Sequence, residues 1–286
     1  MGSALYLWHM PVLDAHAHLF PPEIIRDRHT LAQRESAFSL IYGNERSPMV
    51  DYEGLAAYVA EQQIENVVCC SFPFRDPGLL SQCNDYILEA ARRDACIIPF
   101  VMVGLENGES ALQEAERCLK LGARGIGEMA FYERGFGSRE RERLHELAAY
   151  MEGKKLILQL HLNEQVGHTY KGKGEIEFRE VVRFIEMHPN LDTIFAHLGG
   201  GLCFYEFMPE IRKLFTRVYY DLAATPYLYS KEIYSYIERF LPDKVLFGSD
   251  FPLLSFNRYR TEMSAMGAEG REKVCYWNGR RLFGAP

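Results

Sequence analysis

Short apolar runs alternate with longer amphipathic stretches along most of the chain. Most of the short runs are continuously hydrophobic, which is typical of strands buried on both faces in a parallel sheet. In the longer stretches the apolar positions recur every three to four residues, as in Leu112, Ala115 and Leu119, which indicates helices with one buried face. The pattern predicts eight strands, at residues 11–15, 66–72, 97–103, 123–128, 155–160, 193–196, 217–222 and 244–248.

Helices are predicted to follow these strands in strict alternation. Helix-ending residues support their bounds, because Gly122 and Gly153 follow two of the stretches and Pro189 and Pro242 lie just past two more. Such alternation favours a single-domain (β/α)8 TIM barrel over an open doubly wound sheet, and we expect residues 1–286 to form it. The predicted helices cover residues 52–63, 79–94, 109–121, 138–152, 175–188, 204–214, 231–240 and 269–283.

Composition is compatible with one large globular domain. The chain has 286 residues, and α/β barrels commonly reach about 250 residues as one domain. Apolar residues make up 48% of the sequence and charged residues 25%, which excludes a disordered chain. No run approaches the roughly 18 to 20 apolar residues of a membrane span, and the first residues lack the pattern of a signal peptide. We expect a cytoplasmic protein.

Cysteine usage and net charge narrow the range of partners. The seven cysteines are scattered without a C-x-x-C pair, which indicates reduced thiols and neither a disulfide framework nor a thiolate zinc site. The net charge is −7 and no stretch concentrates Lys and Arg, which disfavours nucleic-acid binding. We expect a small-molecule substrate and no membrane partner. The many tyrosines on predicted helices leave a homodimer open.

Histidines and carboxylates end several of the predicted strands. His16 and His18 follow the first strand in the run DAHAH, and a two-residue spacing in an extended chain places both imidazoles on one face. In a barrel the carboxyl ends of the strands carry the active site, so these side chains are expected to meet. The same position is taken by Glu128, His161, His197 and Asp250, which end the fourth, fifth, sixth and eighth strands.

These six side chains have the chemistry of metal ligands. Imidazole nitrogens and carboxylate oxygens suit Zn, Mn, Fe(II) and similar divalent ions. A catalytic site needs three or four such ligands and an open position for water. Purely structural polar residues would be scattered through the core and would not end apolar strands on one side of the fold. The sequence therefore predicts a divalent metal site with one or two ions.

The motifs at these strand ends resemble a known family. The DAHAHLF start, the strand-end His161, the AHLGGG around His197 and the FGSDFP around Asp250 are similar to those of the amidohydrolase superfamily. They resemble in particular its amidohydrolase-2 branch, which includes aminocarboxymuconate semialdehyde decarboxylase and related metal-dependent hydrolases. The resemblance runs from residue 12 to about residue 283. It implies a (β/α)8 barrel with a divalent metal, usually zinc, held by His16, His18, His161 and Asp250.

Glu128 and His197 distinguish two variants of that site. In decarboxylase-like members of the branch, the sixth-strand histidine is expected to be a catalytic acid/base beside a single metal. In the deoxyribonuclease-like TatD relatives, a fourth-strand glutamate and the sixth-strand histidine help to hold a second metal. The fourth strand reads GIGEM, which resembles the glutamate pattern, and it offers no lysine for a carbamate bridge. Both variants stay open.

The expected reaction follows from the ion. A divalent metal lowers the pKa of its bound water to about 7 and polarises a carbonyl or phosphoryl oxygen. Asp250 is placed to take the proton of that water, and His197 to stabilise or protonate the leaving group. We predict a hydrolase that attacks a C–N or C–O bond of an amide, lactone or similar substrate. A non-oxidative decarboxylase, a TatD-like two-metal phosphoesterase and a metal-binding barrel without turnover are the alternatives.

Four residues in the predicted loops are candidate substrate contacts. His168 and Lys171 lie between glycines in NEQVGHTYKGKG after the fifth strand, which suits a segment that closes over an anionic group. An exposed polar loop is the alternative. Arg75 after the second strand and Tyr132 after the fourth occupy the same predicted face as the metal site.

Two further segments are predicted to lie at the same end of the barrel as the metal site. Residues 21–49, rich in Arg and Glu and weak in period, directly follow the first strand and form either a lid or a solvated connection. The glycines after His197 are predicted to permit close backbone approach. They belong to no nucleotide-binding motif, because the chain has neither G-x-G-x-x-G nor G-x-x-x-x-G-K-[ST].

Overall fold

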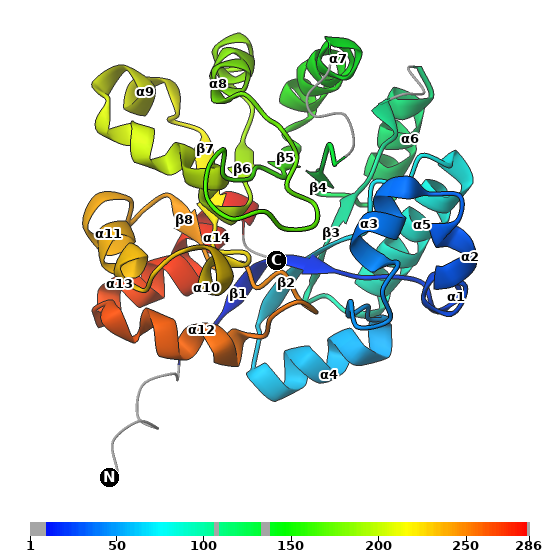
Figure 1. Cartoon of the computed structure of the whole chain (residues 1–286), viewed down its shortest axis with the longest axis horizontal. Coiled ribbons are helices and arrows are strands. Elements are labelled where there is room, and N and C mark those ends of the chain that lie inside the picture. Colours follow the sequence, from blue (N-terminus) through cyan, green and yellow to red (C-terminus); the bar gives the residue numbers. More distant parts are fainter. Residues whose placement is uncertain (1–9, 106–108, 133–137, 285–286) are drawn as a thin grey trace.

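The computed structural model describes residues 10–105, 109–132 and 138–284 and shows a barrel of eight parallel strands (Figure 1). Each strand pairs in parallel with the next one in the sequence. The (β/α)8 prediction is confirmed. The strands are β1 (Leu13–His18), β2 (Asn66–Cys70), β3 (Ile97–Val101), β4 (Gly125–Met129), β5 (Ile157–Leu160), β6 (Thr193–Phe195), β7 (Val218–Asp221) and β8 (Val245–Leu246).

Backbone hydrogen bonds between the last and the first strand region close the barrel. The amide of Ala15 donates to the carbonyl of Phe247 over 2.7 Å, and the amide of Asp250 donates to the carbonyl of His16 over 2.9 Å. The first strand is longer than predicted, because its polar end at His18 still pairs with β2. The closing hydrogen bond between Asp250 and His16 therefore joins two candidate metal ligands through their backbones.

Helices surround the strands, and aspartate side chains cap two of them. Asp51 and Asp76 accept backbone amides at the starts of two helices, over 3.1 and 3.0 Å. No helix within the described ranges is long and apolar enough to cross a membrane. The helices that follow the strands are α4 (Tyr52–Gln62), α5 (Pro77–Arg93), α6 (Glu109–Lys120), α7 (Ser138–Lys154), α8 (Phe178–Met187), α9 (Pro209–Leu214), α11 (Glu232–Phe240) and α14 (Asn278–Phe283).

Shorter helical segments fill the connections. The helix predicted at residues 204–214 is interrupted, because Pro209 cannot continue a helix from the residues before it and begins a new one. The helix predicted at residues 269–283 consists of two α-helical segments with one π-helical segment between them. The additional segments are α1 (Pro22–Arg26), α2 (Arg28–Ala32), α3 (Ser36–Tyr42), η2 (His197–Phe207), α10 (Thr225–Leu228), α12 (Phe256–Glu262), η3 (Met263–Ala265), α13 (Ala268–Glu272) and η4 (Lys273–Trp277).

The barrel interior is a packed apolar core below the polar strand ends. Side chains from strands on opposite sides of the barrel form one buried cluster, to which Phe100 of β3, Ile194 of β6 and Leu246 of β8 belong. Residues from such distant strands can meet only inside the barrel. Phe283 of α14 packs against this cluster. The interior is thus filled with side chains, and the open end of the barrel is left to the histidines and carboxylates.

The segment of residues 21–49 is not a solvated connection. Its side chains at Ile24, Leu31 and Phe38 are 2%, 5% and 0% exposed. Phe38 contacts Phe72 and Phe74 after β2, with ring centroids 5.5 and 5.1 Å apart. The solvated alternative is therefore wrong, because these apolar side chains fix the three short helices against the barrel.

The turn after β6 depends on glycine, as the sequence predicts. From His197 to Gly201 the backbone has positive φ angles, which L-residues with a side chain rarely adopt. A Cβ atom at Gly200 would overlap the backbone carbonyl of Asn163 in the loop between β5 and α8. The glycine therefore permits the two backbones to approach, and this approach fixes the loops on either side of the site.

Candidate metal centre

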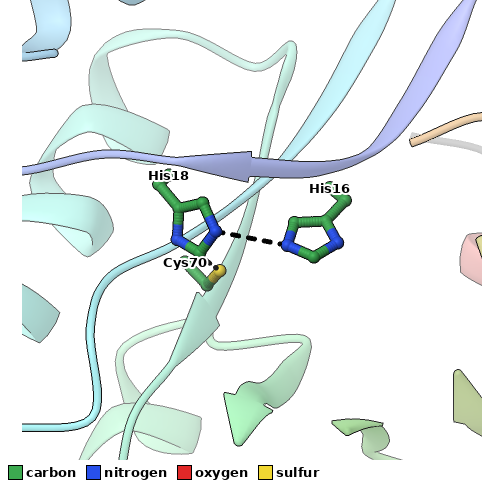
Figure 2. A group of neighbouring side chains, drawn as sticks. All are labelled: His16, His18 and Cys70. Atoms are coloured by element: carbon green, nitrogen blue, oxygen red, sulfur yellow. Dashed lines mark hydrogen bonds between the residues drawn. The ribbon is translucent and has the colours of Figure 1, made fainter. Parts of the chain in front are cut away.

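His16 and His18 present one nitrogen each to the same point in space. Their Nε2 atoms lie 3.3 Å apart, and Figure 2 shows the two rings facing each other from one strand. The Nδ1 atom of His16 donates to Asp221 over 2.9 Å, and that of His18 to the carbonyl of Ser71 over 3.3 Å. Because both Nδ1 atoms are occupied by acceptors, the Nε2 lone pairs are free to bind a cation between them.

Two carboxylates complete this set of donors. Asp250 Oδ1 lies 3.1 Å from the Nε2 atom of His18 and 3.8 Å from that of His16. Glu128 Oε2 lies 3.5 Å from His16 Nε2 and 3.8 Å from His18 Nε2. Donors in a tetrahedral site about 2.0–2.3 Å from their ion lie about 3.3–3.8 Å from one another. Five of the six donor pairs therefore have separations close to those of a tetrahedral site, which suits a single divalent ion.

The second oxygen of Glu128 faces another pair of histidines. Its Oε1 atom lies 2.9 Å from His161 Nδ1 and 3.2 Å from His197 Nε2, and these two nitrogens are 3.1 Å apart. His161 thus reaches the first donor set only through Glu128. The structure brings together all six residues predicted as ligands, arranged as two sets that share one carboxylate.

Cys70 lies close to the first donor set and contacts the Nδ1 atom of His18. Its Sγ atom is 3.6 Å from Nδ1 of His18, while Nε2 of that ring points to His16 (Figure 2). The thiol also lies within 4.8 Å of one ligand nitrogen of each histidine, so it borders the first donor set. Cys70 packs beneath the ring and helps to fix its orientation.

Asp221 at the end of β7 supports both donor sets, and the strand-end prediction above omits it. Its Oδ2 accepts from His16 Nδ1 and from Gln159 Nε2 over 2.9 and 3.0 Å. Its Oδ1 accepts the backbone amides of His197 and Ala223 over 2.9 and 3.0 Å. The same signal could have found it, since Asp221 ends the apolar run RVYYDL.

Replacing Asp221 with asparagine is expected to weaken metal binding about 10–100-fold. An asparagine amide offers only one acceptor oxygen for its four donors, so the orientation and tautomer of His16 are no longer fixed. Competition with a chelator measures the affinity. Asp192→Asn is the matched control, because Asp192 precedes β6 and pairs with Arg217 away from the donors. An affinity for D221N within twofold of wild type would rule out this supporting role.

The charges within the cluster raise the pKa values of His16 and His197 and lower the pKa of Asp250. Burial disfavours the charged form of His16, but the carboxylates of Glu128 and Asp221 outweigh it and raise the pKa of this imidazole well above its usual value. Burial acts likewise on His197, and the hydrogen bond and charge of Glu128 raise its pKa to about 9. For Asp250, burial is outweighed by the hydrogen bond with His18 and the charge of His16, which lower its pKa to about 2.

Metal affinity is therefore expected to rise with pH between 6 and 8. Below the raised pKa values of His16 and His18, an ion must displace a proton from each imidazole that it binds. Each displaced proton gives about a tenfold gain in affinity per pH unit. Asp250 is ionised throughout this range and adds no slope. Chelator competition at several pH values measures the slope, and an affinity independent of pH would contradict this protonation pattern.

A pocket of about 740 Å³ opens above the donors. Glu128, His161, His197 and Asp250 lie at its floor and are buried or nearly so. Aromatic side chains form much of its wall, and the rings of Phe72 and Tyr132 lie nearly parallel, at 6° with centroids 5.7 Å apart. Among the candidate substrate contacts, the pocket is lined by Tyr132, His168 and Lys171.

Arg75 is not brought to this pocket. Arg75 is exposed, and its backbone amide donates to the carboxylate of Glu35 over 3.0 Å, which fixes the chain after β2. The pocket instead receives Ile41, Tyr42 and Arg46 from the segment of residues 21–49. That segment is therefore part of the pocket wall, and Arg46 is a lining residue that its weak sequence period did not reveal.

Comparisons with known proteins agree with this architecture. A search of curated proteins finds no significant match. Among solved structures, 5-carboxyvanillate decarboxylase from Novosphingobium aromaticivorans, complexed with manganese and 4-hydroxy-3-methoxy-5-nitrobenzoic acid, is 14% identical with a TM-score of 0.73, over 97% of each chain. A dihydroxybenzoic acid decarboxylase from Polaromonas, with bound manganese and an inhibitor, is 15% identical with a TM-score of 0.69, over 96% of this chain and 97% of that one.

A third structure and a family model complete the comparison. 2,6-Dihydroxybenzoate decarboxylase from Rhizobium is 15% identical with a TM-score of 0.66, over 96% of this chain and 98% of that one. At such low identities these structures show a shared fold. The model of the amidohydrolase family matches residues 13–285, a range that includes every strand and all six donors. The chain therefore belongs to the amidohydrolase family.

Proposed function

We propose that this protein is a metal-dependent, non-oxidative decarboxylase of an aromatic or conjugated carboxylic acid. The observation that carries the proposal is a pocket with aromatic walls directly above a floor of metal-binding donors. Phe72 and Tyr132 both line the pocket with nearly parallel rings that stack on each other, and an aromatic substrate packs favourably against such rings. The named proteins of the same fold are decarboxylases of dihydroxybenzoate and of carboxyvanillate, which are aromatic acids.

The apolar wall also suits the loss of carbon dioxide. A carboxylate loses its localised charge as carbon dioxide departs, so an environment that solvates the carboxylate poorly favours the transition state over the ground state. Phe72 is 2% exposed and lines the pocket together with Tyr42, which is 7% exposed. A substrate carboxylate beside these side chains would lie against apolar surface instead of water.

The donor set accounts for metal dependence in this reaction. His16, His18, Asp250 and Glu128 would hold one ion, because their donor atoms lie 3.1–3.8 Å from one another in the measured pairs. When bound, a divalent ion supplies positive charge that neutralises and orients the oxygens of the substrate. Zinc, which the family resemblance implies, is one choice, and manganese and iron suit the same ligands.

His197 is the proposed proton donor. Its Nδ1 donates to the carbonyl of Ala223 over 2.9 Å, which fixes the ring, and its Nε2 faces Glu128 at the pocket floor. Burial lowers its pKa, but the hydrogen bond and charge of Glu128 outweigh burial and raise it to about 9, which favours the protonated imidazole. As the bond to the carboxylate breaks, its electron pair stays on the substrate carbon and takes the Nε2 proton. The products are carbon dioxide and the protonated ring.

Product analysis tests the proposal. Metal-reconstituted protein is incubated with a panel of hydroxybenzoic acids and related carboxylated phenols, and carbon dioxide and the decarboxylated ring are measured by gas analysis and mass spectrometry. We expect both products in equal amounts, and a rate about 10²–10⁴-fold lower for His197→Gln, because a glutamine amide is too weak an acid to protonate the substrate carbon. Hydrolysis of amides or lactones, without carbon dioxide from any acid, would refute decarboxylation.

Hydrolysis is the second candidate, and the position of Glu128 favours it. One oxygen of this carboxylate faces His16 and His18, and the other faces His161 and His197. A carboxylate shared in this way is the arrangement that bridges two ions in hydrolytic sites. With two ions bound, His197 would be a ligand and could not donate a proton. The number of bound ions therefore separates the two candidates.

A further inference from the structure

Two basic side chains line the pocket but take no part in the donor sets. Arg46 lies after α3, and Lys171 lies in the loop between β5 and α8. Both residues are exposed, whereas the donors at the floor are largely buried, so the two cations lie toward the mouth. In the part of the chain that the structure describes, neither side chain has an ion-pair or hydrogen-bond partner.

Arg46 is presented by a turn with a fixed backbone. Its amide donates to the side chain of Asn44 over 3.0 Å, and the amide of Ser47 donates to the carbonyl of Asn44 over 2.9 Å. The same carbonyl accepts from the guanidinium of Arg28, which is 9% exposed, over 3.2 Å. These hydrogen bonds fix the backbone of the turn, while the Arg46 side chain extends from it to the pocket.

Lys171 is presented by a loop that is pinned at its base. Asn163 binds Gly174 across the loop through two hydrogen bonds of 2.6 and 3.0 Å. Next to Lys171, a Cβ atom at Gly172 would lie 2.8 Å from the side chain of Ile41, so the loop touches the segment that carries Arg46. Figure 1 shows this loop, in green between β5 and α8, lying across the open end of the barrel.

The charges of the pocket are divided between its floor and its mouth. Glu128 and Asp250 are the acidic residues of the described lining, and both face the donor histidines. A divalent ion would balance these two carboxylates, which leaves the positive charges of Arg46 and Lys171 without a counter-charge from the protein. An anionic group on the substrate would supply it, because guanidinium and ammonium groups both bind carboxylates.

We propose that the pocket selects aromatic acids with a second anionic group at the end of the ring opposite the reacting carboxylate, and that Arg46 and Lys171 bind this group. The inference rests on the proposed function for the orientation of the substrate, with its reacting carboxylate at the floor. The volume of about 740 Å³ leaves room for a ring with substituents at both ends.

Calorimetric binding to metal-loaded protein tests the inference without turnover. Benzene-1,4-dicarboxylate carries a carboxylate at each end of its ring, and benzoate lacks the second one. We expect wild type to bind the dicarboxylate at least about tenfold more tightly than benzoate. The double variant Arg46→Gln/Lys171→Gln should lose this preference. The double control Lys213→Gln/Lys231→Gln removes the same charge from exposed positions outside the pocket lining and should retain it.

The outcomes separate this inference from the proposed reaction. Equal affinities of wild type for the two acids would overturn the inference, as would a preference that survives in the double variant or a complete lack of dicarboxylate binding. Carbon dioxide release from monoacids without any dicarboxylate preference would leave the decarboxylase proposal intact and remove only this selection. A dicarboxylate preference that depends on both cations, without carbon dioxide release, would retain the anion site and remove the reaction.

Discussion

Replacing His16 and His18 together with alanine is expected to remove the bound ion and lower turnover by roughly 10³-fold. The two Nε2 atoms, 3.3 Å apart, are the nitrogen donors of the first set, and only the oxygens of Glu128 and Asp250 would remain there. A bound ion contributes several kcal/mol to transition-state stabilisation, and each 1.4 kcal/mol corresponds to about tenfold in rate. Elemental analysis and product formation measure the two effects.

A control and a fold check make this result specific. His29→Ala removes an exposed imidazole that pairs with Glu45 outside the site, and it should change neither metal content nor rate. Because His16 is fully buried, circular dichroism and thermal unfolding must show that the double variant is folded. A folded double variant that still binds stoichiometric metal would contradict the assignment of these ligands.

Asp250→Asn is expected to lower turnover by about 10²–10⁴-fold while the fold stays intact. The carboxylate lies 3.1 Å from His18 Nε2, and asparagine would place an uncharged amide in its position. The backbone at Asp250 has a φ of 61°, a conformation that asparagine tolerates better than most residues. The substitution therefore changes the charge and leaves the turn after β8 in place.

The rate of D250N must be measured at saturating metal, because the loss of one donor also weakens binding. Asp243→Asn is the matched control, since Asp243 is paired with Lys273 outside the donor sets. Near-normal turnover of D250N under these conditions would show that the Asp250 carboxylate is not needed for the reaction.

Much of the candidate site could be predicted because the fold dictates where strands end. Parallel strands in a barrel bring their carboxyl ends together, so polar residues that end apolar runs must meet. His16 and His161 are 145 positions apart in the sequence, yet both lie within 3.5 Å of Glu128. The spacing of the motifs was sufficient to find these residues, because no detail of the loops was required.

Other parts of the site depend on contacts that sequence patterns do not encode. Asp221 ends its strand like the ligands do, but whether a strand-end side chain binds an ion or orients a ligand depends on its rotamer and neighbours. Arg46 reaches the pocket because Phe38 anchors its segment against Phe72 and Phe74. Arg75 was expected on the same face, but the chain there is fixed by Glu35 and the residue does not line the pocket.

The sequence also does not determine the number of bound ions. The GIGEM motif places a carboxylate at the end of β4, but only the orientation of the Glu128 side chain shows that its two oxygens face different histidine pairs. Decarboxylation as proposed requires that one set binds an ion and that His197 keeps its proton. Hydrolysis requires that both sets are filled.

The metal content of the wild-type protein tests this account most directly. The protein is stripped of metal, reconstituted separately with manganese, zinc and iron, freed of unbound ions, and analysed for metal per chain. We expect about one ion per chain with at least one of these metals, held by the four donors around His16 and His18. About two ions would shift the account to hydrolysis, and a protein that binds none of the three metals would contradict the metal centre itself.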